Sequence, residues 1–211
     1  MKLLPPYAPS PKDSSHKMLL KAERFLFAVG LGVNFLVNLV AIPEEYFLYL
    51  SNWGMFFAFL FFLIASLGYC FPVLDGVAYI LFEISWPLEW LITLAYWTAV
   101  FPLDYKINLL VSLMLHGLPL ILLVIDCCLS RIVILRSHWG YPFAVSFVYA
   151  FCVNLPVTLS YQRLYPLISY QNAWTYIMLL VGALVEILAM EVHYRFKHMY
   201  LLIEQEALLE I

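Results

Sequence analysis

The sequence predicts an all-α fold, a polytopic transmembrane helical bundle of six spans with both termini in the cytoplasm. Hydrophobic residues make up 64% of the 211 positions and charged residues only 12%, whereas a soluble domain carries about 25% charged residues. Lipid must therefore cover most of the surface. Apolar stretches close to the roughly 20 residues that a membrane helix needs recur along the chain, and the basic residues gather on one side of them.

Each predicted span is an apolar stretch that ends at a proline, an acidic residue or a polar loop. We expect the six spans at residues 25–42, 53–71, 87–101, 107–125, 141–161 and 173–194. Glu83, Pro87 and Glu89 interrupt the region of the third span. Residues 76–86 are therefore predicted to form an irregular or interfacial lead-in to it.

The two ends of the chain are predicted to lie outside the membrane domain. The first 20 residues contain four prolines and scattered charges, not the apolar core and small-residue cleavage site of a signal peptide. The first span is then itself the membrane signal. We expect a mobile cytoplasmic tail at 1–22, a six-helix transmembrane domain at 23–195 and a cytoplasmic amphipathic tail at 196–211.

The orientation of the bundle follows from its basic residues. With six spans, nine of the 11 basic residues fall on the side of the two termini, and only Lys106 and Arg163 fall on the other side. Cytoplasmic segments carry the excess of Lys and Arg, so both termini are expected inside. The nine are Lys2, Lys12, Lys17, Lys21, Arg24, Arg131, Arg136, Arg195 and Lys197.

Polar side chains at similar depth on four predicted spans form the candidate site. Asn34, Asn38, His116 and Asn154 lie between about 6 and about 14 Å from the outer face, at a rise of about 1.5 Å per residue. Ser51 begins the second span, and two carboxyl groups, Glu89 and Glu186, lie about 20 Å deep. Each also has a structural interpretation, because asparagines often bond neighbouring helices, Ser51 suits a helix cap, and His116 fits a buried structural histidine.

The chemical interpretation joins Ser51 to His116. A hydroxyl becomes a strong nucleophile when a base takes its proton, and neutral imidazole is the usual base. Glu186, Glu89 or an asparagine is expected to orient the ring or line the substrate pocket. The chain has no G-x-S-x-G elbow, zinc motif, phosphate loop or dinucleotide fingerprint. We expect no cofactor and no metal, and we interpret the four cysteines as buried structural thiols.

Short motifs around these residues resemble the androgen-induced-protein family, which includes the androgen-dependent regulator of tissue factor pathway inhibitor. Tyr49-Leu50-Ser51-Asn52-Trp53 is similar to the motif that opens the family's second span. The segment 115–126 resembles the histidine-containing span, with Asp126 ten positions after His116. Tyr141-Pro142 and Tyr165-Pro166-Leu167 match two Tyr-Pro landmarks.

The resemblance extends in order over roughly residues 45 to 195. It is closest to an uncharacterised fungal branch of the family. The third span of that branch is similar to Trp86-Pro87-Leu88-Glu89 and Trp97 of this chain. Family members are six-span membrane threonine hydrolases that cleave fatty acid esters of hydroxy fatty acids. The resemblance implies that Ser51 replaces the nucleophilic threonine and that His116 is the catalytic histidine.

Two departures from the family pattern bear on this assignment. Serine keeps the hydroxyl of threonine, so nucleophilic attack remains chemically feasible. The family's Asn-His-Gly-x-His run keeps one histidine here, with Ser112 and Leu113 at the matching earlier positions. His116 matches the second histidine by its interval to Asp126, or the first by the glycine that follows it.

The expected partners are membrane lipid and a small lipid substrate. A net charge of −3 argues against nucleic acid, and the sequence leaves any protein partner unknown. The expected location is the endoplasmic reticulum membrane. Two other functions stay open: a non-catalytic scaffold or accessory subunit that binds lipid or a partner protein, and a small transporter, which the deep carboxyl groups Glu89 and Glu186 would suit.

Overall fold

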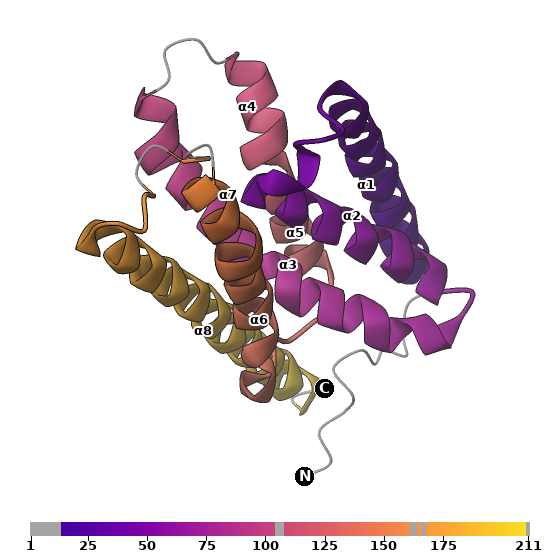
Figure 1. Cartoon of the computed structure of the whole chain (residues 1–211). Helices are drawn as coiled ribbons and strands as arrows, with labels where there is room; N and C mark the ends of the chain where they lie inside the picture. The colour runs from indigo at the N-terminus through magenta and orange to yellow at the C-terminus, as the bar shows by residue number, and fades with distance from the viewer. Residues whose placement is uncertain (1–13, 104–107, 161–163, 166–167, 210–211) are drawn as a thin grey trace.

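All regular structure in the computed structural model of the chain is helical over the residues it describes, which are 14–103, 108–160, 164–165 and 168–209 (Figure 1). The prediction of an all-α fold is confirmed. The α-helices are α1 (Ser14–Ala41), α2 (Leu50–Gly68), α3 (Asp75–Ala95), α4 (Leu109–His116), α5 (Leu118–Leu129), α6 (Gly140–Val148), α7 (Leu155–Ser160) and α8 (Ala173–Leu209). Short 3₁₀ turns are η1 (Tyr46–Leu48), η2 (Pro72–Leu74), η4 (Phe101–Leu103) and η5 (Arg136–His138), and two π-helical segments are η3 (Tyr96–Val100) and η6 (Tyr149–Asn154).

Five continuous helical stretches are long and apolar enough to cross a membrane. The pair α4 and α5, bent by 45° at its break, makes a sixth if it is counted as one span. The chain is therefore built as a multi-pass membrane protein. The five stretches are Met18–Ala41, Leu50–Gly68, Pro72–Val100, Arg136–Ser160 and Ala173–Leu201.

The structure describes parts of both expected tails as helix, which leaves their position relative to the membrane a prediction. α1 begins at Ser14, so residues 14–22 belong to the first helix, and residues 1–13 lie outside the described part of the chain. α8 runs without a break from Ala173 to Leu209. The C-terminal tail predicted from residue 196 is therefore a continuation of the last helix.

The prediction of an irregular segment over residues 76–86 is wrong, because these residues form the regular first half of α3; the interfacial alternative stays a prediction. The sequence suggested a break because Glu83 is charged and Pro87 lacks an N–H. The Glu83 carboxylate instead accepts a hydrogen bond from the backbone N–H of Leu135 at 3.0 Å, and its other oxygen lies 2.7 Å from His138 Nδ1. Once its partners are supplied from another part of the chain, the buried carboxylate no longer opposes the helix.

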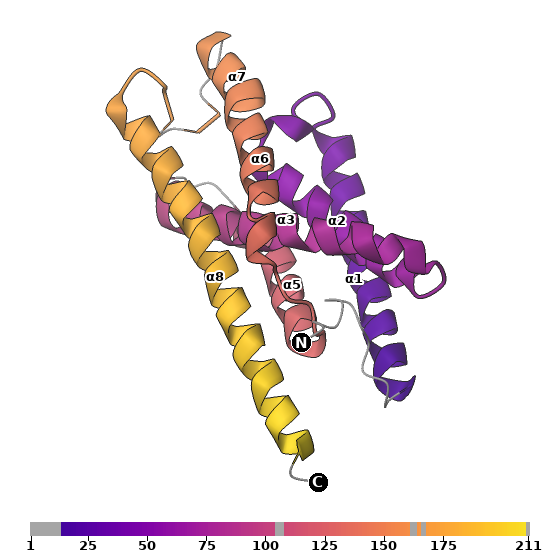
Figure 2. The same ribbon diagram turned by 90° about the horizontal axis from the view of Figure 1, so that it is seen from below.

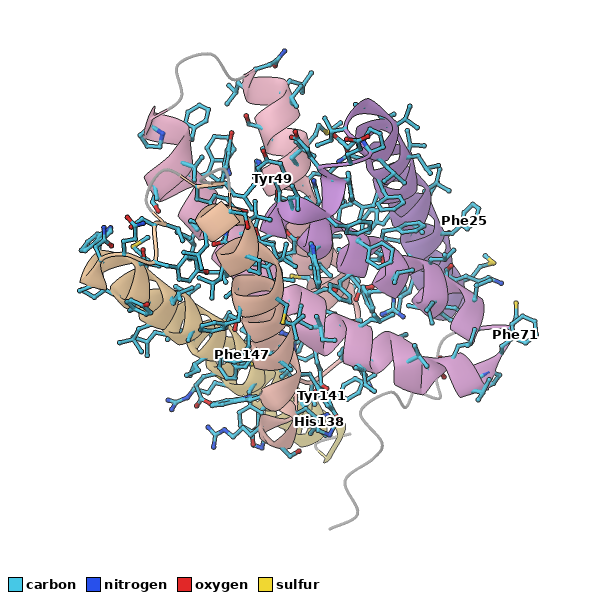
Figure 3. All side chains as sticks on the ribbon, viewed as in Figure 1. Phe25, Tyr49, Phe71, His138, Tyr141 and Phe147 are labelled. Atoms are coloured by element: carbon cyan, nitrogen blue, oxygen red, sulfur yellow. The ribbon has the colours of Figure 1, made fainter. Side chains whose placement is uncertain are left out.

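α3 is the central helix of the bundle. More than half of its most apolar window is buried, against 17% for α1, and it packs on α2, α5, α6 and α8. Phe61, Phe62 and Phe82 form the aromatic centre of the core where α2 meets α3. By contrast, Phe25 and Phe71 point away from the bundle (Figure 3), as side chains facing lipid would.

Ionic and carbonyl contacts bring the start of α1 and the end of α8 to one end of the bundle. Arg24 forms a buried ion pair with Asp126 at 2.5 Å, and Lys197 donates to the carbonyl oxygens of Cys127 and Ser130. Figure 2 shows the beginning of α1 and the end of α8 at the same end. We call this the terminal end, and the opposite end, marked by η1 and Tyr165, the loop end.

Three helices depart from regular geometry, each next to a proline. The π-helical segments η3 and η6 stand directly before Phe101-Pro102 and Leu155-Pro156. Proline offers no N–H to the carbonyl four residues earlier and its ring crowds that carbonyl, so the preceding turn widens. Such π-helical turns occur frequently at functional sites.

The third irregularity is the break between α4 and α5, where Pro119 offers no N–H to the carbonyl of Leu115. Side chains of two other helices bond carbonyls that the bend exposes. Asn34 donates to Met114 at 2.9 Å, and Thr93 donates to His116 at 2.8 Å. A broken membrane helix needs such partners because lipid supplies none.

Candidate functional site

One apolar cavity of about 540 Å³ lies among α2, α3, α6 and α8. Residues from both π-helical segments line it, and so does His116 at the end of α4. All three helix irregularities therefore border the same space. Leucine, isoleucine, alanine and aromatic side chains form most of its wall, which suits an acyl chain.

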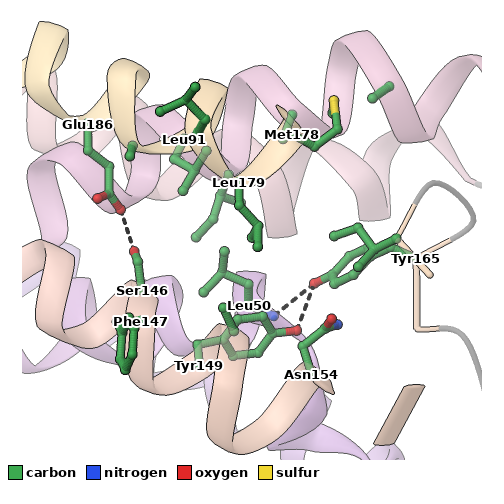
Figure 4. A pocket seen from close by; sticks show the side chains of 18 of the residues that line it. Leu50, Leu91, Ser146, Phe147, Tyr149, Asn154, Tyr165, Met178, Leu179 and Glu186 are labelled. Atoms are coloured by element: carbon green, nitrogen blue, oxygen red, sulfur yellow. Dashed lines mark hydrogen bonds between the residues drawn. The ribbon is translucent and has the colours of Figure 1, made fainter. Parts of the chain in front are cut away.

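The start of α2 carries Ser51 into the cavity wall. Two tyrosines hold this helix start. The Tyr149 hydroxyl donates to the Leu48 carbonyl at 2.7 Å, and the Leu50 N–H donates to the Tyr165 hydroxyl at 2.9 Å. The two hydroxyl oxygens lie 3.3 Å apart (Figure 4), so η6 and Tyr165 fix the backbone on which Ser51 stands.

Asn154 lies beside this tyrosine pair, at the last position of η6. Its side chain is 1% exposed and lines the cavity. It approaches the Tyr149 hydroxyl (Figure 4), yet neither its amide nitrogen nor its amide oxygen has a well-formed hydrogen bond among the described residues. A buried amide left in this state is costly, so Asn154 is suited to bind a polar group in the cavity.

His116 lines the same cavity from the last position of α4. Its ring stacks on Tyr96, whose hydroxyl donates to Ser112 at 2.8 Å. Nδ1 of His116 is buried and has no hydrogen-bond partner among the residues the structure describes. Within the same residues, no hydrogen bond joins His116 to Ser51, although both border the cavity.

Glu186 and Ser146 form a second polar group on the cavity wall. The Ser146 hydroxyl donates to Oε1 of Glu186 and so joins α6 to α8 (Figure 4). Glu186 is 1% exposed, and its Oε2 is buried with no hydrogen-bond partner in the described part of the chain. This carboxyl group can therefore accept a hydrogen bond from a ligand.

Three residues of the predicted site do not line the cavity. Asn34 and Asn38 lie on α1, where the Asn38 amide donates to the carbonyl and side-chain oxygens of Asn34 at 2.7 and 2.8 Å, and Asn34 bonds α4. Asn34 therefore bonds a neighbouring helix, whereas the bonds of Asn38 to Asn34 lie within α1. Glu89 is fully buried beside Gly54 and Ile92, and neither of its oxygens has a hydrogen-bond partner among the described residues.

Several residues of the cavity wall escaped the sequence analysis of polar groups, chiefly Tyr96, Ser146, Tyr149 and Tyr165. Tyr165 belongs to a Tyr-Pro landmark, which was a usable signal. Burial raises the pKa of the Tyr165 hydroxyl above its ordinary value of 10.0. The other three look like ordinary members of apolar helices.

No three His, Cys, Asp or Glu side chains in the described ranges lie together as a metal-binding cluster. No family model, curated protein or solved structure matches this chain. Its function is therefore inferred from the cavity and the side chains around it.

Proposed function

We propose that the protein is an integral membrane lipid ester hydrolase of the androgen-induced-protein family, cleaving fatty acid esters of hydroxy fatty acids. One observation carries the proposal: a hydroxyl, Ser51, and an imidazole, His116, border one apolar cavity together with a buried amide, Asn154, that has no well-formed hydrogen bond among the described residues. The resemblance of the motifs around Ser51 and His116 supports the same two residues.

In the proposed reaction, Ser51 Oγ attacks the ester carbonyl carbon and its proton passes to His116. The carbonyl π electrons move to oxygen, and Asn154 donates a hydrogen bond to that oxyanion. The intermediate collapses to an acyl-serine, and the leaving alkoxide takes the proton from His116. His116 then takes a proton from a water molecule, and the resulting hydroxide attacks the acyl-serine carbonyl. The ester bond to Ser51 breaks, the fatty acid is released, and His116 gives its proton to the Ser51 oxygen.

The proposed topology has six spans, both termini in the cytoplasm, and the endoplasmic reticulum as the host membrane. The first half of α1 and the second half of α8 both contact the end of α5, through Arg24 and Lys197, and this shared position supports an even number of crossings. The concentration of basic residues at the terminal end supports a cytoplasmic position for that end. Ser51, at the loop end, then lies in the outer or lumenal half of the bilayer.

A serine-reactive fluorophosphonate probe on the purified protein tests the proposal. Labelling is expected in the wild type and in Ser51→Thr, which keeps the hydroxyl, and is expected to disappear in Ser51→Ala. His116→Ala should label at least about 100-fold more slowly, because general-base catalysis contributes about 10²–10⁴-fold. Labelling that survives unchanged in Ser51→Ala would overturn the assignment of the nucleophile.

A second candidate function is that of a non-catalytic lipid-binding scaffold or accessory subunit. The observation that favours it is that no hydrogen bond joins Ser51 and His116 among the described residues. Normal cell function of Ser51→Ala and His116→Ala variants, with a stoichiometric partner that co-purifies, would support this candidate over the hydrolase.

A further inference from the structure

The cavity has two polar regions separated by an apolar one. At the loop end lie Ser51, Tyr149, Asn154 and Tyr165, which we call the loop-end group. Ser146 and Glu186, which we call the deep pair, lie on the wall farther along α6 and α8. Figure 4 shows the side chains of Leu91 and Leu179 between the two.

The deep pair lies well inside the membrane-spanning part of the bundle. Glu186 is about 20 Å along α8 from its start at Ala173, and Ser146 is roughly 12 Å along its helix from Asn154. A ligand that holds its reacting carbonyl at the loop-end group would therefore place the distal part of its chain against Glu186.

Oε2 of Glu186 can accept a hydrogen bond that no residue in the described ranges supplies. His116 is the only Lys, Arg or His side chain among the described residues that line the cavity, so a protein cation is not placed to pair with the carboxyl. The complementary ligand group is a hydrogen-bond donor. An alcohol suits this position because it can donate to Oε2 without bringing a charge into the apolar cavity, and burying a charge costs more than burying a hydroxyl.

We infer that the deep pair is a specificity site for a hydroxyl group on the distal part of the acyl chain. The inference rests on the proposed function in one respect, in that it takes an acyl lipid as the occupant of the cavity. Its ligand class is a fatty acid ester with one further polar group: the ester carbonyl is held near Ser51, and a free alcohol, additional to the esterified one, stands on the acyl chain and donates to Glu186 Oε2. Ser146 is a positioning residue, since its hydroxyl holds the other carboxyl oxygen.

Binding of non-cleavable ligands tests the inference without turnover. The probes are long-chain alkyl ethers, one plain and the others carrying a single hydroxyl group that moves stepwise along the distal half of the chain. Their dissociation constants are measured on the full chain in detergent micelles. At one or two hydroxyl positions, the wild type is expected to bind about tenfold more tightly than it binds the plain ether.

Glu186→Met is expected to abolish this preference while keeping the affinity for the plain ether. Glu89→Met is the matched control, because Glu89 is an equally buried carboxyl that does not line the cavity, and it should keep the preference. Ser146→Ala keeps the carboxyl but removes the hydroxyl that positions it, so it should weaken the preference several-fold, which provides a second variant if Glu186→Met fails to fold.

Equal binding of all the ethers by the wild type overturns the inference, and so does a preference that survives in folded Glu186→Met or disappears in Glu89→Met. Ester turnover is measured separately on the same preparation. A hydroxyl preference without any turnover would reject the hydrolase and keep the specificity site. Ester turnover without a hydroxyl preference would reject the specificity site and keep the hydrolase.

Discussion

The imidazole ring of His116 stacks on the phenol ring of Tyr96, with ring centroids 3.6 Å apart and planes inclined by 16°. Tyr96 is the first residue of the π-helical segment η3, and His116 is the last residue before the break between α4 and α5. Two irregular helix turns therefore face each other through these rings, and the stack fixes the plane of the proposed base.

Replacing Tyr96 should impair the proposed base without removing it. Tyr96→Leu loses the stack, so the imidazole is held less rigidly, and kcat for ester hydrolysis is expected to fall about 10- to 100-fold, because misplacement by about 1 Å can cost 100-fold. Tyr96→Phe keeps the ring and loses only the hydrogen bond to Ser112, so its kcat should stay within about threefold. Equal losses in the two variants would contradict a role for the stack.

Replacing Asn154 should slow the chemical step. If its amide stabilises the oxyanion, Asn154→Ala is expected to lower kcat about 10²- to 10³-fold with little change in KM. Asn38→Ala removes a membrane asparagine that does not line the cavity, and it should leave kcat unchanged. A KM effect alone in Asn154→Ala would assign the amide to ground-state binding instead.

The buried ion pair between Arg24 and Asp126 should respond asymmetrically to mutation. Arg24→Met leaves an uncompensated carboxylate, so unfolding in mixed detergent micelles is expected to require roughly 3–5 kcal/mol less free energy. The double variant Arg24→Met/Asp126→Leu should recover most of this loss, because no charge is then left alone. A double variant no more stable than the single one would show that the pair contributes more than charge compensation.

A side chain at residue 117 should disturb the break that positions His116. A Cβ added to Gly117 would lie 2.9 Å from Leu113 Cδ1 and 3.2 Å from the Leu113 carbonyl oxygen, closer than ordinary carbon contacts. Gly117→Ala is therefore expected to lower both thermal stability and fluorophosphonate labelling. Gly140→Ala is the control, because nothing lies within 4 Å of its added Cβ, and it should change neither measurement.

Composition was enough to predict an all-helical membrane bundle, since the charge content excludes a water-covered surface. Helix continuity was harder to predict from local signals. Glu83 and Pro87 suggested a break in α3 where none exists. The Glu83 carboxylate finds its partners in the segment containing Leu135 and His138, which the local sequence does not show. The actual bend at Gly117 lies two residues before Pro119, inside a stretch that the sequence analysis predicted as one continuous span.

The estimated depth of polar residues along their helices predicted some residues of the cavity wall, such as Asn154. It also selected residues that do not line the cavity, such as Asn34, because depth does not give the direction in which a side chain faces. Asn34 and Asn154 were assigned similar depths, yet Asn34 faces α4 and Asn154 faces the cavity. Depth gives position along the membrane normal, whereas the facing direction depends on how the helices pack. The tyrosines around Ser51 were missed because a tyrosine in an apolar helix shows its role only through the carbonyl or N–H that it meets.

The length of α8 has a mechanical consequence. Its 37 residues make a rod of about 55 Å, while the hydrocarbon layer is about 30 Å thick. At ordinary tilts the helix is therefore longer than the hydrocarbon layer, and we expect the excess at the terminal end, where α8 ends. Because α8 is one continuous helix, a force or a bound protein at its C-terminal end would move the part of α8 that carries Glu186 in the cavity wall.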